Sequence, residues 1–144
     1  MNAAQILNAL ERERQLLQEF RSISQQQLVL VDAEDIEGVN QLLDHRADLM
    51  LELTAIESTL GTWIEQIRRD SSVTPEMMRE FRNVNEEIIQ LANHVVEIDE
   101  QTHWRLDLIK TRCGNELRSL NRGAKALKGY DRSFGVIPDL ENLV

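Results

Sequence analysis

The chain has 144 residues, of which 42% are hydrophobic and 28% are charged, and this composition suits one globular domain with a single core. Six aromatic residues and two prolines are too few for a turn-rich β-sandwich or barrel. A single cysteine excludes an internal disulfide, no run approaches the length of a membrane span, and the first residues lack the pattern of a signal peptide. The sequence predicts an all-α, cytoplasmic protein without membrane insertion.

Residues 3–31 and 36–70 are predicted to form two amphipathic helices, because apolar side chains recur on one face of each segment with charged side chains opposite. The run VDAED between them offers Asp32 or Asp35 as the N-cap of the second helix. We therefore expect the chain to reverse there and form a helical hairpin.

A third helix is predicted to begin at Pro75, with Thr74 as its N-cap. Its apolar positions alternate in steps of four and three, which is typical of a coiled-coil seam and predicts antiparallel packing against the earlier helices. These positions are Met77, Phe81, Val84, Ile88, Leu91, Val95 and Ile98. The same face continues through Thr102, Leu106, Ile109, Cys113, Leu117, Leu120, Ala124 and Leu127, until Gly129 offers a helix stop.

The third helix is too long for its neighbours. At 1.5 Å per residue, 75–128 would span about 80 Å, against roughly 43 and 51 Å for the first two helices. Either Gly114 acts as a hinge, or the last turns project and leave their apolar side chains uncovered, as at a partner site. Residues 1–129 are thus predicted to form an antiparallel three-helix bundle, made of a long hairpin and a longer third helix, and 130–144 a flexible or loosely docked tail.

Charge is unevenly distributed along the chain. The net charge is −9, but residues 105–132 hold eight Lys and Arg against three Asp and Glu, so this segment carries +5 and the remainder −14. Cations near a helix C-terminus favour the negative end of its dipole, which is one explanation. The other is a docking face for an acidic partner.

No catalytic constellation is evident in the sequence. Glu100 and His103 form one Glu-x-x-His motif, whereas a di-iron bundle needs two and further glutamates. Phosphate-binding glycine loops, a nucleophile elbow and paired cysteines are missing. We therefore predict no enzyme, no metal and no cofactor. Trp63 and Trp104 are interpreted as core residues, and Arg46 as a boundary residue whose head stays in water.

Two stretches resemble flagellar type III export chaperones of the FlgN and FliT type. They are LVDAEDIEGVNQLLDHRADLMLEL at 30–53 and ELRSLNRGAKALKGYDRSFG at 116–135. The resemblance implies a cytosolic chaperone that binds the C-terminal amphipathic helix of a late substrate, either a hook–filament junction protein or a filament-cap protein. The chaperone would then deliver this client to the cytoplasmic domain of the export gate.

The resemblance also implies roles for the basic C-terminal segment. The uncovered stripe of Leu117, Leu120, Ala124 and Leu127 would bind the client helix. The family's C-terminal tyrosine, which docks on the export gate, corresponds to Tyr130, flanked by Lys128 and Arg132. An alternative from a different class is a structural or regulatory coiled-coil protein that self-associates, for example as a homodimer, through the same stripe. Nucleic acid is not an expected partner, because the chain is acidic.

Overall fold

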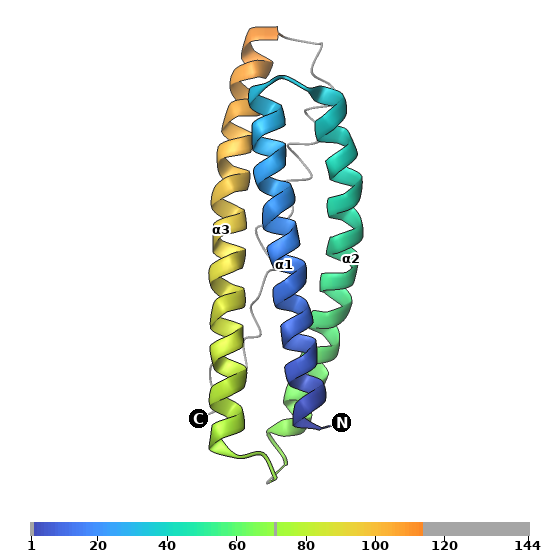
Figure 1. Ribbon diagram of the computed structural model, residues 1–144, viewed down its shortest axis with the longest axis vertical. Coiled ribbons are helices and arrows are strands. Elements are labelled where there is room, and N and C mark those ends of the chain that lie inside the picture. The colour runs from blue at the N-terminus through green and yellow to red at the C-terminus, as the bar shows by residue number, and fades with distance from the viewer. Residues whose placement is uncertain (1, 71, 114–144) are drawn as a thin grey trace.

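The computed structural model describes residues 2–70 and 72–113, which form three helices. α1 spans Ala3–Asp32, α2 spans Ile36–Ile67 and α3 spans Pro75–Cys113. Consecutive helices run in opposite directions, so α1 and α3 are parallel (Figure 1). The all-α three-helix bundle expected from the sequence is confirmed. The predicted hinge at Gly114, the helix stop at Gly129 and the tail 130–144 lie outside the described residues.

Local hydrogen bonds explain where α1 begins. Asn2 caps the helix, because its side chain accepts a hydrogen bond from the Gln5 backbone N–H at 2.9 Å. The Gln5 side chain in turn accepts from the Asn2 backbone N–H at 2.9 Å. This reciprocal capping box satisfies two donors that the first turn of a helix leaves without partners.

The turn between α1 and α2 is equally well defined. Glu34 adopts a left-handed conformation with φ of 58°, and the Asp35 N–H donates to the Leu30 carbonyl at 2.9 Å. Asp35, one of the two predicted caps, accepts from the Gly38 N–H at 2.9 Å. A Cβ atom at Gly38 would lie 2.7 Å from Asp35 Oδ2, so a side chain there would require the capping carboxylate to shift. These contacts fix the chain reversal that the sequence predicts.

The start of α3 follows the sequence prediction. The Met77 N–H donates to Thr74 Oγ1 at 3.2 Å, and Pro75 is the first helical residue. Proline is favourable there, because its missing N–H would have had no helical partner.

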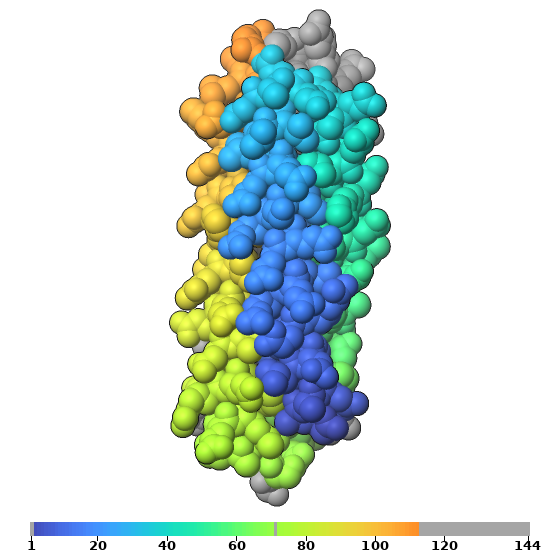
Figure 2. All heavy atoms as spheres, viewed as in Figure 1, coloured from blue at the N-terminus to red at the C-terminus, as the bar shows by residue number. Residues whose placement is uncertain are grey.

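α1 is the central helix of the bundle. Figure 2 shows its side chains between those of α2 and α3 on one face of the molecule. Among the described residues, α1 packs closely against both other helices, whereas the backbones of α2 and α3 do not approach each other as closely. The α3 seam therefore packs against the parallel helix α1. α3 also runs antiparallel to α2, as predicted, but its closest backbone packing is along α1, which has the same direction (Figure 1).

One apolar core runs the length of the bundle. From the predicted seam, Phe81, Ile88 and Val95 are at most 1% exposed, whereas Met77 is only partly buried and Met78 is buried in its place. The apolar residues with at most 1% exposure in α1 and α2 are Ile6, Leu10, Leu16, Leu17, Phe20, Val31, Val39, Leu53, Leu60 and Ile64. None of the described helices is long and apolar enough to cross a membrane.

Candidate functional site

The predicted client-binding residues Leu117, Leu120, Ala124 and Leu127 lie outside the described residues, as do Lys128, Tyr130 and Arg132. The structure describes the part of the bundle from which this segment departs. That part includes the end of the α1–α2 hairpin and the last described turns of α3.

Two ion pairs mark where the hairpin ends along α3. Arg105 Nη1 lies 3.0 Å from Asp32 Oδ1, at the last residue of α1. Arg112 forms an ion pair with Glu34, in the turn itself. The turn between α1 and α2 therefore lies beside residues 105–112 of α3, and the apolar positions from Leu117 onward come later in the sequence than this point.

Burial along the α3 stripe falls toward this end. Thr102 and Leu106 are 0% and 3% exposed, and Ile109 is only partly buried. A surface hollow opens here, lined by Val31, Asp32, Glu34, Arg105, Leu108, Ile109 and Arg112. The hairpin thus stops covering the stripe within the last turns of α3 that the structure describes.

The same ion pairs account for part of the charge asymmetry. Arg105 and Arg112 belong to the basic segment 105–132, and both are paired with carboxylates of the α1–α2 turn. The acidic turn between α1 and α2 is therefore a partner for this chain's own cations. This intramolecular pairing is a third explanation of the basic segment, besides the helix dipole and an external acidic partner.

A second set of apolar side chains is exposed on α3. Trp104 is 60% exposed and Leu108 is 51% exposed. They are four residues apart and lie two positions before and after Leu106, which places them on the helix face opposite the buried stripe. The interpretation of Trp104 as a core residue is wrong, because its position is out of phase with that stripe. Trp63 does pack partly buried against the core.

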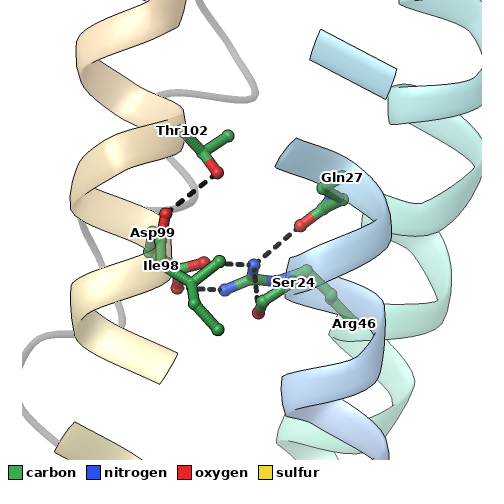
Figure 3. A network of polar contacts seen from close by, with 6 residues as sticks. All are labelled: Ser24, Gln27, Arg46, Ile98, Asp99 and Thr102. Carbon is green, nitrogen blue, oxygen red and sulfur yellow. Dashed lines mark hydrogen bonds and ion pairs between the residues drawn. The ribbon is translucent and has the colours of Figure 1, made fainter. Parts of the chain in front are cut away.

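Arg46 of α2 is fully buried and is the centre of a polar network that joins the three helices (Figure 3). Its guanidinium donates to both carboxylate oxygens of Asp99 on α3, at 2.8 and 2.7 Å. It also donates to Gln27 Oε1 at 2.7 Å and Ser24 Oγ at 3.1 Å, both on α1. Its Cζ atom lies 4.4 Å from the centroid of the Phe20 ring. We call this set the Arg46–Asp99 layer.

The interpretation of Arg46 as a boundary residue with its head in water is therefore wrong. The sequence did contain a signal, because Asp99 follows Ile98 on the buried face of α3 and is an acidic residue next to the seam. A buried charge is tolerated only when an opposite charge and further hydrogen bonds replace its water. The layer supplies both, and it fixes the relative register of the three helices.

A second polar group is buried nearer the other end of the bundle. The Glu13 side chain of α1 is 0% exposed, and no described donor forms a hydrogen bond with either carboxylate oxygen. Burial, together with the adjacent Glu57 carboxylate of α2, raises the pKa of Glu13 to about 8. We call Glu13 and Glu57 the carboxyl pair. Sequence reasoning missed it, because glutamates are so common on helix surfaces that two of them give no sign of facing each other.

The Glu-x-x-His motif does not form part of a metal centre within residues 2–70 and 72–113, where no group of three or more His, Cys, Asp or Glu side chains could hold an ion. His103 instead lies beside Asp107, with 3.3 Å between His103 Nε2 and Asp107 Oδ2. This is an ordinary contact between residues four apart on a helix.

Comparisons with known proteins give no relative for this chain. No family model matches it, and no curated protein or solved structure matches it. Its function is therefore inferred from its own residues and their contacts, together with the sequence resemblance.

Proposed function

We propose that this protein is an export chaperone of the FlgN/FliT type. It binds the C-terminal amphipathic helix of a flagellar hook–filament junction or filament-cap protein and delivers this client to the cytoplasmic domain of the type III export gate. The proposal starts from the resemblance of 30–53 and 116–135 to that family.

The observation that carries the proposal is the position of the hairpin end. The Arg105–Asp32 and Arg112–Glu34 ion pairs put the α1–α2 turn beside residues 105–112 of α3. The apolar stripe continues in the sequence through Leu117 to Leu127, after the hairpin has ended. A stripe of this kind is a complementary surface for another amphipathic helix.

This arrangement suits a client whose own apolar face must be covered before assembly. An exposed i, i+3, i+4 stripe would otherwise drive aggregation or premature polymerisation. Helix-in-groove binding hides that face while leaving the remainder of the client free. The proposed chemistry is reversible burial of apolar surface, with no bond made or broken.

The client-binding claim is tested by the double variant Leu120→Asp with Leu127→Asp, titrated calorimetrically with a peptide of the client's C-terminal helix. We expect affinity to fall at least about tenfold, because each charge must lose its water on binding. The matched control is Val29→Asp with Leu51→Asp, which alters two apolar residues of the hairpin that are 66% and 72% exposed. This control should bind the peptide as the native chain does.

Unchanged client affinity in the leucine double variant contradicts the assigned site. Loss of the helical circular-dichroism signal in that variant, with the control still folded, shows instead that the stripe is part of the core.

The gate-docking claim has a separate test. Tyr130→Ala should weaken binding to the soluble domain of the export gate, because tyrosine at an interface buries its ring while its hydroxyl keeps a hydrogen bond. Client affinity should stay within about 1 kcal/mol of the native value, since Tyr130 is not one of the apolar residues of the stripe. Normal binding to both partners removes Tyr130 from the docking site.

Sedimentation velocity distinguishes the proposal from a self-associating coiled coil. If the protein is a chaperone, we expect it to bind the client peptide at protein concentrations where the protein itself is monomeric. A stable homodimer that dissociates in the Leu120→Asp with Leu127→Asp variant, without any client binding by the native protein, supports the structural alternative.

A further inference from the structure

The carboxyl pair combines features that a folded protein avoids unless they are compensated. Glu13 lies on the central helix with its side chain fully buried, and Glu57 approaches it from α2. Two ionised carboxylates accept hydrogen bonds but cannot donate one to each other. This explains why neither oxygen of Glu13 has a described donor. One proton would supply the missing O–H donor.

The described cations around Glu13 do not supply the compensation. At this level of the bundle the charged residues are Glu11, Arg12 and Arg14 of α1, Glu52 and Glu57 of α2, and Arg82, Glu86 and Glu87 of α3. Arg12 lies 3.0 Å from Glu52, and Arg14 lies 2.6 Å from Glu87. None of the described cations forms an ion pair with Glu13. Arg12 and Arg14 are thus directed at other carboxylates.

We propose that Glu13 and Glu57 share one proton in the folded protein, and that loss of this proton is a pH-sensitive switch which weakens the packing of α1 against α2. The protonated Glu13 donates its O–H to the Glu57 carboxylate, as paired acids do when like charges cannot both be ionised. Glu57 is only partly buried, so the proton can exchange with water. At pH values above that at which the proton is lost, two negative charges face each other between α1 and α2.

The direction of the pH effect follows from linkage. The pKa of Glu13 is raised from 4.5 to about 8 by folding. Below pH 4.5 both folded and unfolded chains hold the proton, and the stabilising effect is fully present. Between pH 4.5 and about 8 the unfolded chain releases it while the folded chain keeps it, so the unfolding equilibrium constant rises about tenfold per pH unit from this group. Above about pH 8 both states are ionised and the effect levels off.

The experiment compares urea unfolding of the full chain and its Glu13→Gln variant from pH 4 to pH 9.5. Glutamine has the shape of the protonated acid and does not titrate. We expect the ratio of unfolding constants, native over variant, to rise about tenfold per pH unit between pH 5 and 7.5 and to become constant above about pH 8. The ratio cancels other titrating groups. A ratio independent of pH, or a Glu13→Gln variant that does not fold, overturns the proposal.

Two further variants separate a shared proton from burial alone. Glu57→Gln removes the like charge, so the pH at which the ratio levels off should fall below that of the native chain. An unchanged value shows that Glu57 takes no part. Glu52→Gln is the matched control, because Glu52 is a glutamate of the same helix that is exposed and paired with Arg12. It should keep the native pH profile, and loss of the profile in this variant also overturns the assignment to the pair.

Discussion

Two sites with buried ionisable side chains, among the described residues of this bundle, differ in how their charge is matched. In the Arg46–Asp99 layer a guanidinium meets a carboxylate through two hydrogen bonds, and Ser24 and Gln27 of α1 accept further hydrogen bonds from it. In the carboxyl pair, a fully buried Glu13 meets only another acid among the described groups. Arg46 and Glu13 are both 0% exposed. Burial is therefore the same, and the sign of the neighbouring charge is what differs.

The comparison shows that the charge of the neighbouring groups decides whether a buried side chain is ionised or protonated. An opposite charge with matched donors makes ionisation tolerable in the interior, as at Arg46. Where no opposite charge is present, the less costly solution is to keep a proton, and burial together with the Glu57 carboxylate therefore raises the pKa of Glu13. The first layer fixes the helix register, and the second makes the bundle's stability depend on pH.

The largest effect is expected where a charge has neither kind of partner. Ile88 of α3 is 0% exposed and belongs to the apolar core between the two polar levels. Ile88→Asp should lower stability by several kcal/mol and unfold the protein, because an isolated carboxylate loses its water without compensation. Circular dichroism with thermal melting measures this. A native-like spectrum with an unchanged melting temperature would show that the seam around Ile88 is not part of the core.

Acid-to-leucine substitutions should have opposite signs at the two sites. Asp99→Leu should lower the free energy of unfolding by about 3–5 kcal/mol, because it leaves the Arg46 charge buried without its counterion. Adding Arg46→Met should recover much of this loss, since the unpaired charge is then gone. Urea unfolding at pH 8 measures all three chains. A double variant no more stable than Asp99→Leu would show that the layer acts through shape and not through charge.

Glu13→Leu is the counterpart at the carboxyl pair. It should raise the free energy of unfolding at pH 8 by about 1–3 kcal/mol, because a buried polar group without a described donor is replaced by an apolar one. The gain should shrink as the pH falls toward 5, where the native chain keeps the proton at no cost. The same urea series measures it, and destabilisation at both pH values would contradict the comparison.

The smallest effect is expected at an exposed ion pair. Arg12 and Glu52 lie 3.0 Å apart, but both side chains are about half exposed. Arg12→Ala should change the free energy of unfolding by less than about 1 kcal/mol, because water already solvates both charges. Urea unfolding at low and high salt checks this. A loss of stability as large as that of Asp99→Leu would mean that burial does not explain the difference between buried and exposed ion pairs.

Much of the fold could be predicted from the sequence, because periodicity and caps are local signals. The seam from Phe81 to Ile98, the Asp35 cap and the Pro75 start each depend on residues within a few positions of one another. The parallel packing of α3 on α1 could not be read from that seam, because a heptad pattern is compatible with either direction.

The partners of the buried polar groups could not be predicted, because the residues that meet are far apart in the chain. Arg46 finds Asp99 across 53 positions, and Glu13 meets Glu57 only after the hairpin has formed. A single arginine within an apolar face has the same pattern whether it is buried or reaches water. The candidate client-binding and gate-docking residues remain predictions, since 117–132 lies outside the described residues.

The most direct test of the contrast between the two polar groups is a carbon-13 NMR titration of the side-chain carboxyl carbons of glutamate in the folded protein. The Glu13→Gln variant identifies the Glu13 signal by its disappearance. We predict that this signal titrates with a midpoint near pH 8, because burial and Glu57 raise the pKa of Glu13 to about that value. A midpoint near the ordinary glutamate value of about 4.3 would show that Glu13 is ionised at neutral pH, and would contradict the account.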